Sequence, residues 1–295
     1  MIGRITKAIS GFYYVTVDDT VFECKARGSF RRQGITPLVG DFAQITAADA
    51  SHGIVEKICE RKNALSRPLI ANIDKLFIVS SYNTPSPDLL MIDRLTAVAV
   101  YHGIEPVIVF NKSDMGDFSP YLDIYKKSGF KCYAVSAIKG DGVDELSKEL
   151  CGCVSAFSGN SGVGKSSLLN AFFGDELKLL TGEVSDKLGR GRHTTRHTEL
   201  YRHKYEGFVA DTPGFSSVDG DNASFDFKEH LSECFPDLYE FAKACKFTGC
   251  THTCEKGCGV LDAVENKQIA QSRHNSYCAM FEELKDLKQW NTKKK

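Results

Sequence analysis

Residues 159–166, which read Gly-Asn-Ser-Gly-Val-Gly-Lys-Ser, constrain the fold of this chain more than any other segment. They fit the pattern G-x-x-x-x-G-K-[ST], in which glycines let the backbone curl until successive N–H groups point at one cluster of phosphates. Residues 154–157 resemble a short buried strand, and residues 167–173 a helix whose N-terminus would face those phosphates. A chance Gly/Ser loop would not need both flanks. We therefore predict a phosphate-binding loop made of Gly159, Asn160, Ser161, Gly162, Val163, Gly164, Lys165, Ser166 and Ser167.

Two side chains of this loop carry chemistry. Lys165 supplies a positive charge for the β- and γ-phosphates, and the Ser166 hydroxyl can ligate Mg²⁺. The loop alone does not distinguish ATP from GTP.

A second motif selects the base. Asn111, Lys112, Ser113 and Asp114 follow residues 105–110, which have the pattern of a buried strand. At a strand end, the Asp114 carboxylate can accept hydrogen bonds from N1–H and N2–H₂ of guanine, whereas adenine would leave it unpaired. Asn111 can tie this loop to the phosphate loop, and the Lys112 stem can cover the base. An isolated N-K-x-D is usually a solvated turn, but beside a phosphate loop it indicates guanine.

The order of the motifs is unusual. Ser136 and Ala137, after the strand predicted at residues 131–135, resemble a second base-contacting loop, and Asp211 opens a D-x-x-G motif at residues 211–214. The guanine loop precedes the phosphate loop, whereas ordinary GTPases have the reverse order. The same sheet forms if the usual termini are joined and the chain is opened between D-x-x-G and the strand before the guanine loop. We therefore expect a circularly permuted GTPase domain over residues 74–220, with a mostly parallel sheet and nucleotide at the carboxyl ends of its strands.

Residues 174–192 are polar and Gly-rich and predict a mobile switch segment that leads into residues 193–195. Two features of this switch matter for catalysis. A switch threonine should ligate Mg²⁺ together with Ser166, Asp211 should support the ion through water, and chemistry does not separate Thr194 from Thr195. Phe215 follows D-x-x-G where many GTPases carry glutamine, so intrinsic hydrolysis should be slow. His193 is our candidate for positioning the attacking water, once a partner orders the loop. The alternative is a surface histidine in a flexible loop.

The first 65 residues contain five short β-rich runs, which favour a small barrel of the oligonucleotide-binding (OB) type. Between two of them lies a basic segment with no acid. It suits phosphate contacts combined with base stacking, unless the segment is a solvated loop with its phenylalanine in the core. Residues 66–73 are predicted to be a linker. The candidate RNA-binding residues are Lys25, Arg27, Phe30, Arg31 and Arg32.

Residues 221–295 are predicted to form a helical domain that carries a metal site. Cys245, Cys250, His252 and Cys258 can close a tetrahedral Zn²⁺ site. Cys254 could replace His252, and reduced cysteines that only pack are the other alternative.

The amino-acid composition indicates the class of protein and its cellular compartment. The 295 residues are enough for two or three domains, and 42% hydrophobic with 25% charged residues is ordinary for a soluble protein. The net charge of −1 means that only local patches can bind nucleic acid. No apolar run approaches a membrane span, and no signal peptide is evident. Eleven cysteines without a leader favour a reducing, cytoplasmic location and metal binding over disulfides.

Taken together, the motifs resemble the family of circularly permuted GTPases represented by ribosome small-subunit-dependent GTPase A (RsgA, also called YjeQ). The resemblance covers nearly the whole chain. It rests on residues 93–95 (Asp-Arg-Leu), 189–195 (Gly-Arg-Gly-Arg-His-Thr-Thr), 211–215 (Asp-Thr-Pro-Gly-Phe) and 272–277 (Ser-Arg-His-Asn-Ser-Tyr), together with the cysteine cluster.

The resemblance implies further expectations: an OB domain on ribosomal RNA, His252 as a zinc ligand and His193 at the water. It also implies the small (30S) ribosomal subunit as partner late in its maturation, bound more tightly in the GTP state. We thus expect a monomeric cytoplasmic GTPase that uses Mg²⁺ with GTP and holds one structural Zn²⁺. The competing hypotheses are a P-loop kinase and an RNA-binding module that keeps its nucleotide as a structural ligand.

Overall fold

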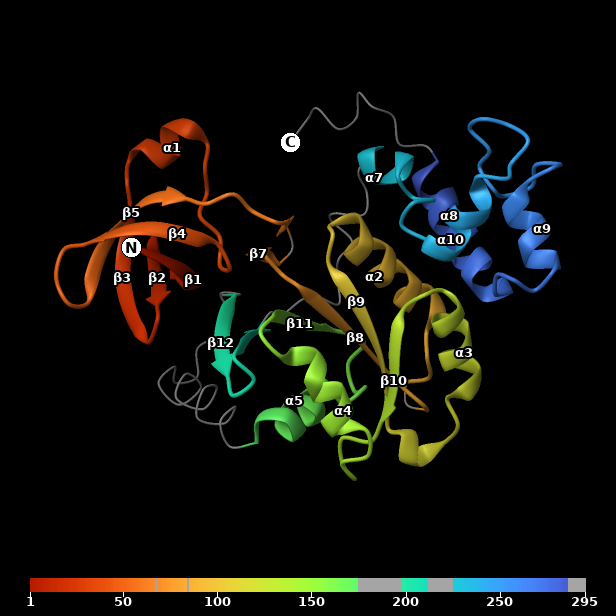
Figure 1. Cartoon of the computed structure of the whole chain (residues 1–295), viewed down its shortest axis with the longest axis horizontal. Coiled ribbons are helices and arrows are strands. Elements are labelled where there is room, and N and C mark those ends of the chain that lie inside the picture. Colours follow the sequence, from red (N-terminus) through yellow and green to blue (C-terminus); the bar gives the residue numbers. More distant parts are fainter. Residues whose placement is uncertain (67, 84, 175–197, 212–224, 286–295) are drawn as a thin grey trace. The chain divides into compact units, whose positions relative to one another are not determined.

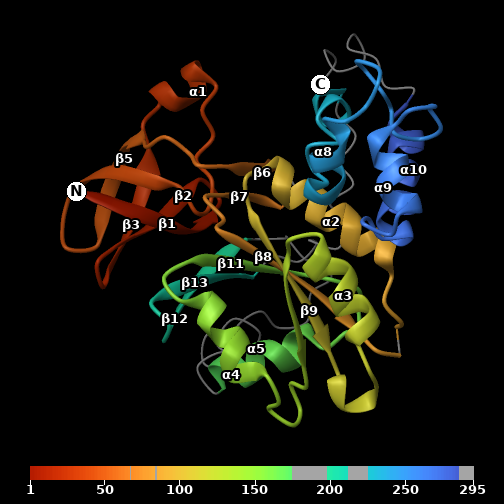
Figure 2. The same cartoon turned by 45° about the vertical axis from the view of Figure 1, so that its right-hand side comes forward.

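The structure is a computed structural model that describes residues 1–66, 68–83, 85–174, 198–211 and 225–285 (Figures 1 and 2). Its chain forms two compact units, each of which is built from three stretches of sequence. The first comprises Met1–Lys75, Ser147–Phe157 and Leu169–Ser217, and the second comprises Leu76–Leu146, Ser158–Leu168 and Val218–Lys295.

The first unit begins with a five-stranded barrel (Figure 1). Strand β1 pairs antiparallel with both β2 and β4, and β5 pairs with β3 and β4, so the sheet closes on itself. The OB-like barrel predicted from the sequence is confirmed. Its elements are β1 (Ile2–Ile9), β2 (Phe12–Val17), β3 (Thr20–Ala26), α1 (Ser29–Gln33), β4 (Phe42–Ala47) and β5 (His52–Ile58).

The barrel core corrects one sequence prediction. Side chains alternate along β4, so Ala43 and Ile45 point inward while their neighbours face solvent. Phe30, at the start of α1, packs into the same core and is only 4% exposed. The proposed stacking of an RNA base on Phe30 is therefore wrong, because its ring already fills the end of the barrel.

The segment predicted as a linker is ordered. Strands β6 (Ala64–Ser66) and β7 (Leu69–Ala71) form an antiparallel hairpin. Ile70, Ala71 and Ile73 are fully buried. Pro68 has no N–H to donate to a strand ladder, and for this reason it favours the prediction of a linker. In the structure Pro68 lies between the two strands, where no such donor is needed.

Three further strands of the described residues belong to the first unit. β11 (Val154–Ser158) runs parallel to β13 (Gly207–Asp211), and β13 forms an antiparallel hairpin with β12 (Glu199–His203). β12 also pairs with β1 of the barrel at Glu199 and Lys7, where the lysine Nζ lies 2.9 Å from a carboxylate oxygen. One hydrogen-bonded ladder therefore runs from β13 through β12 into the barrel.

The second unit carries the other strands of the nucleotide-binding fold, in the order β10-β9-β8. β9 and β10 are parallel, as predicted, and residues 106–111 of β9 are buried throughout. Asp88 caps the first turn of α2 by accepting a hydrogen bond from the N–H of Met91 at 3.1 Å. The elements from β8 to the phosphate loop's helix are β8 (Lys75–Ser81), α2 (Leu89–Tyr101), β9 (Glu105–Asn111), α3 (Ser119–Lys127), β10 (Lys131–Val135), α4 (Val143–Ser147) and α5 (Lys165–Phe173), with 3-10 turns at Ser113–Met115 and Lys148–Leu150.

The C-terminal part of the second unit is helical (Figure 2). Phe227, Leu231, Phe235 and Leu238 are buried and form an apolar core along two short helices, α7 and α8, and the turn between them. Within the described residues, no helix is both long and apolar enough to cross a membrane. The elements are α7 (Phe225–Glu229), α8 (Pro236–Ala242), α9 (Gly259–Glu265) and α10 (Gln271–Leu284).

Candidate nucleotide and metal sites

The phosphate loop connects β11 to α5, and its shape depends on glycine. Gly159 and Gly164 have φ values of +138° and +93°. A Cβ on Gly159 would lie 2.1 Å from the carbonyl oxygen of Val79, and one on Gly164 would lie 2.2 Å from Nδ2 of Asn111. Both positions therefore exclude a side chain on steric as well as conformational grounds.

Lys165 folds back over this loop. Its Nζ donates to the carbonyl oxygens of Gly159, at 2.6 Å, and Asn160, at 2.8 Å. Burial lowers the pKa of the ammonium group. Ser166 and Ser167 are exposed at the start of α5. The loop thus presents a cation and two hydroxyls close to a helix N-terminus, an arrangement suited to phosphate.

Asn111 joins three loops. It ends β9, is 2% exposed, and donates from Nδ2 to the carbonyl oxygen of Val163 at 3.0 Å. Its Oδ1 accepts the N–H of Ala137 at 3.1 Å. The predicted tie between the guanine loop and the phosphate loop is therefore present, and it extends to the second base loop.

Asp114 lies exposed in the 3-10 turn after β9. Ser136 donates from Oγ to Asp114 Oδ1 at 2.7 Å, and this hydrogen bond lowers the pKa of the carboxyl group. Lys112, in the left-handed region at φ +64°, extends its Nζ to the carbonyl oxygen of Gly162 at 2.8 Å. An ionised, oriented carboxylate beside a lysine stem is the geometry that guanine recognition requires.

Several predicted residues lie outside the described part of the chain. They include the switch residues His193, Thr194 and Thr195, and Phe215 after D-x-x-G. Asp211 is described as the last residue of β13.

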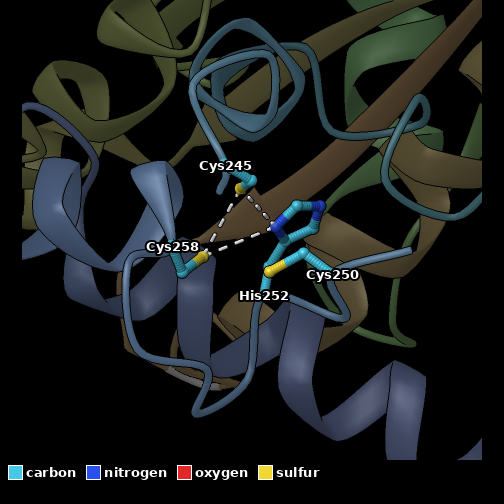
Figure 3. A group of neighbouring side chains, drawn as sticks. All are labelled: Cys245, Cys250, His252 and Cys258. Carbon is cyan, nitrogen blue, oxygen red and sulfur yellow. Dashed lines mark hydrogen bonds between the residues drawn. The ribbon is translucent and has the colours of Figure 1, made fainter. Parts of the chain in front are cut away.

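The four predicted metal ligands meet in the C-terminal region (Figure 3). The ligand atoms of Cys245, Cys250, His252 and Cys258 all lie within 4.8 Å of one another. His252 Nδ1 is 3.4 Å from Cys245 Sγ and 3.5 Å from Cys258 Sγ. Cys254 is exposed and is not part of this group, so the alternative in which it replaces His252 is not supported.

The donor set is chemically suited to a soft or borderline cation. Burial raises the pKa of Cys250 to about 12 and also raises the pKa of Cys258. A bound cation would offset this effect by stabilising the thiolates of Cys250 and Cys258. Three sulfurs and one imidazole nitrogen at these separations fit tetrahedral zinc.

Neighbouring residues support the ligand loop. His274 Nε2 lies 2.7 Å from the carbonyl oxygen of His252, and the Tyr277 hydroxyl donates to the carbonyl oxygen of Thr251 at 3.0 Å. Both belong to the Ser-Arg-His-Asn-Ser-Tyr segment noted in the sequence. Glu255, which the sequence did not indicate, accepts the backbone N–H groups of Thr251, at 2.7 Å, and of Cys254, at 3.1 Å.

The sequence also did not predict a buried ionic cluster in the same unit. Arg273, fully buried on α10, lies 2.7 Å from Asp93 Oδ1 on α2 and 2.8 Å from Asp237 Oδ1 on α8. Ser128, after α3, donates from Oγ to Asp237 Oδ2 at 2.8 Å. The cluster joins α2 and the end of α3 to α8 and α10, the helices that precede and follow the metal-ligand segment in the sequence.

On the barrel, the basic segment is largely exposed. Lys25 Nζ lies 5.0 Å from the centre of the Phe12 ring, and Arg27 Nε lies 2.6 Å from a carboxylate oxygen of Glu56. Arg32 is exposed, whereas the side chain of Arg31 is outside the described set.

The whole chain can now be compared with known proteins. The RsgA GTPase family model matches residues 58–221, and the RsgA N-terminal domain model matches residues 2–55. The chain belongs to the RsgA GTPase family.

Relatives extend over almost its full length. The chain is 43% identical to the small ribosomal subunit biogenesis GTPase RsgA of Alkaliphilus metalliredigens, over 96% of this chain and 97% of the relative. It is 42% identical to the protein of the same name from Geobacillus thermodenitrificans, over 97% and 98%.

Solved structures give the same assignment. YjeQ from Thermotoga maritima matches with a TM-score of 0.80 and 32% identity, over 97% of this chain and 99% of that one. YloQ, described as a circularly permuted GTPase, matches with a TM-score of 0.81 and 35% identity, over 97% and 96%. The predicted RsgA family, its permuted GTPase fold and GTP hydrolysis as its activity are therefore confirmed.

Proposed function

We propose that this protein hydrolyses GTP to GDP and phosphate during biogenesis of the small (30S) ribosomal subunit, at a late step, and that the subunit stimulates hydrolysis. The names of its relatives support the ribosomal assignment. The observation that carries the proposal is the Asn111 network, which holds the guanine loop, the second base loop and the phosphate loop together. A module that only stored a nucleotide would not need the additional D-x-x-G motif after β13.

Each residue of the nucleotide site has a distinct role in this proposal. Asp114 selects guanine, and Ser136 keeps its carboxylate ionised and oriented, while Lys112, Ser113 and Ala137 line the base. Lys165 and the backbone N–H groups of the phosphate loop stabilise charge on the β- and γ-phosphates. Mg²⁺ bound with GTP would neutralise further phosphate charge. Ser166 and either Thr194 or Thr195 would hold this ion directly, and Asp211 would do so through water.

His193 is the residue that we propose for the attacking water. Phe215 takes the place at which many GTPases have glutamine, so another group has to orient the water. An imidazole adjacent to Thr194 and two residues from Thr195 can accept a hydrogen bond from water or its proton. Ordering of this loop by the subunit would explain stimulation.

We further propose the division of labour among domains. Residues 1–65 would contact ribosomal RNA through Lys25, Arg27, Arg31 and Arg32, residues 74–220 would bind GTP, and residues 221–295 would hold one structural Zn²⁺. The protein would act as a cytoplasmic monomer, with its GTP form bound to the subunit more tightly than its GDP form.

The test is GTP hydrolysis with and without purified small subunits, for the wild type and His193→Ala. We expect strong stimulation of the wild type and its loss in the variant, with guanine-nucleotide affinity unchanged. His230→Ala, which changes an exposed histidine outside this site, is the control and should behave as the wild type. Stimulation that survives in His193→Ala would move the water-positioning role elsewhere. Absence of stimulation in the wild type would remove the subunit as the activating partner.

A further inference from the structure

The end of strand β8 touches two nucleotide loops that lie far apart in the sequence. A Cβ on Gly159, at the start of the phosphate loop, would lie 2.1 Å from the carbonyl oxygen of Val79. Three residues after Val79, just beyond the strand, Tyr82 packs on Gly116 with the same closeness. One strand end therefore supports both the phosphate loop and the turn that carries Asp114.

The contact between Tyr82 and Gly116 depends on the absence of a side chain at position 116. A Cβ there would lie 2.0 Å from Cζ of Tyr82 and 2.3 Å from both of its Cε atoms. Gly116 has an extended backbone with φ 172°, which any residue adopts, so conformational freedom does not explain this glycine. What glycine permits here is the close approach of an aromatic ring to the backbone.

A row of aromatic side chains holds the Tyr82 ring in place. The ring meets that of Phe118 edge-on with centres 5.5 Å apart, and Phe118 stacks on Phe110 at 5.0 Å. Phe110 is fully buried and Phe118 is 2% exposed, so both belong to the core. Tyr82 is 37% exposed and ends the row over Gly116. The core thus fixes the ring, and the ring restrains the backbone beneath it.

The turn that carries Asp114 is short and is anchored at both ends. Residues 113–115 form a single 3-10 turn. Asn111 anchors the chain before this turn through its bonds to the other two loops. Tyr82 anchors the chain after it, at Gly116. Asp114 lies between the two anchors, so each of them limits the positions that its carboxylate can reach.

We propose that Tyr82 is a positioning residue for guanine recognition, whose ring holds the turn so that Asp114 is presented to the base. This inference rests on the proposed role of Asp114. A turn that samples other positions binds guanine only in the fraction of molecules in which the carboxylate is in place, and the apparent affinity falls by that fraction. The phosphate loop keeps its own contact with Val79, so affinity for phosphates alone should not depend on the ring.

The experiment uses the full-length protein and two probes, GDP and inorganic tripolyphosphate, each titrated by calorimetry. Tyr82→Ala should weaken GDP binding about three- to tenfold, as expected for the loss of one aromatic pair, and leave tripolyphosphate affinity unchanged. Tyr82→Phe keeps the ring and should bind GDP as the wild type does. In GTP hydrolysis, the KM of Tyr82→Ala should rise while kcat stays the same, because the lost contact serves binding in the ground state and the transition state equally.

Gly116→Ala provides a second route to the same change. Its methyl group would displace the Tyr82 ring, so GDP affinity should fall as it does in Tyr82→Ala. Once the ring is removed the methyl group has room, and the double variant should therefore lose no more affinity than either single variant. Additive losses would overturn the proposal, because they would show that Gly116 serves the turn independently of the ring.

The matched control is Tyr239→Ala, at a tyrosine of α8 that is 42% exposed, and it should keep wild-type affinity for both probes. Wild-type GDP affinity in Tyr82→Ala would overturn the proposal. An equal loss of tripolyphosphate affinity would do so as well, by showing that the whole site is disturbed. Thermal unfolding of each variant checks that the fold is intact under the conditions of titration.

Asp114→Asn, measured in parallel, keeps this inference separate from the proposed function. If Asp114→Asn loses GDP affinity and Tyr82→Ala does not, only the role of Tyr82 is lost. If Asp114→Asn binds GDP as the wild type does, the assignment of Asp114 to guanine has itself failed.

Discussion

Asp114 keeps its carboxylate in solvent while Ser136 donates to one of its oxygens, so the other oxygen is ready for a ligand. Asp114→Asn replaces an acceptor with an amide that presents a donor to the N1–H of guanine. We expect GTP affinity to fall about a hundredfold or more, and xanthosine triphosphate, which offers a carbonyl oxygen at position 2, to bind in its place. Titration with fluorescent nucleotides measures both effects. The control is Asp117→Asn, at an exposed carboxylate that accepts a hydrogen bond from Ser119, and it should change the affinity for neither nucleotide. Equal losses of GTP affinity in the two variants would contradict the role of Asp114 in guanine recognition.

His203 makes stability depend on pH. It is 7% exposed and stacks on Phe173 with ring centres 4.9 Å apart, and its buried Nε2 has no hydrogen-bond partner among the described residues. Burial lowers the pKa of this imidazole to about 4. Because the folded-state pKa lies below the ordinary value of about 6.5, the unfolded state binds more protons between these limits, and stability falls as pH falls from 6.5 to 4.

The expected loss is up to about 3 kcal/mol across that window. Urea unfolding of the wild type and His203→Phe between pH 4 and 7 measures it. The variant should show a flatter profile, whereas His52→Gln, at an exposed histidine of the barrel, should keep the wild-type slope. A profile for His203→Phe that parallels the wild type would show that another group causes the loss.

At the scale of elements, the cluster of Arg273, Asp93 and Asp237 joins α10, α2 and α8. Arg273→Ala leaves two buried carboxylates without their cation, and we expect the free energy of unfolding to fall by about 3–5 kcal/mol. Arg94→Ala is the matched control, because Arg94 pairs with Glu283 between the same two helices, α2 and α10, at a site where both side chains are partly exposed. That loss should be below about 1 kcal/mol. Comparable losses of unfolding free energy in the two variants would mean that the buried Arg273 cluster stabilises the fold no more than the partly exposed pair.

The metal loop gives a second prediction at this scale. Cys258 is 1% exposed within the cluster, whereas Cys254 is exposed outside it. Cys258→Ser should abolish stoichiometric zinc binding and lower the melting temperature, and Cys254→Ser should do neither. Elemental analysis and thermal unfolding with and without a chelator provide the measurement. Zinc retained by Cys258→Ser and lost by Cys254→Ser would reverse the ligand assignment.

For the whole molecule, the near-zero net charge places any electrostatic attraction to RNA in local segments. Removing Lys25, Arg27 and Arg32 together should weaken small-subunit binding and reduce its salt dependence by about 0.7–0.9 per lost phosphate contact. Lys57→Ala changes an exposed lysine elsewhere on the barrel and should have little effect. The test is affinity for the small subunit measured from about 50 to about 300 mM salt. An unchanged slope of log affinity against log salt would show that this segment does not contact RNA.

Features that depend on short stretches of backbone were predictable from the sequence. The glycine pattern of the phosphate loop, the Asn111 tie and the Cys/His spacing all act within one loop or between loops at the ends of strands. Features set by packing between distant segments were not. The direction of Phe30 depends on how α1 closes the barrel, and the partners Arg273 and Asp93 are 180 residues apart. No local pattern indicates their burial, because Phe30 lies in a basic segment and arginine and aspartate are mostly exposed in proteins.

The ladder from β13 through β12 to β1 has a mechanical consequence. Strand β13 ends at Asp211, where the D-x-x-G motif begins, and β12 begins at Glu199, soon after the predicted switch. Both strands are hydrogen-bonded in register, and Glu199 is also held to Lys7 of the barrel. Because Glu199 pairs with Asp211, the start of the D-x-x-G motif and the contact with Lys7 lie at the same end of the hairpin. A displacement of Asp211 during hydrolysis would therefore reach the barrel across a single strand, β12.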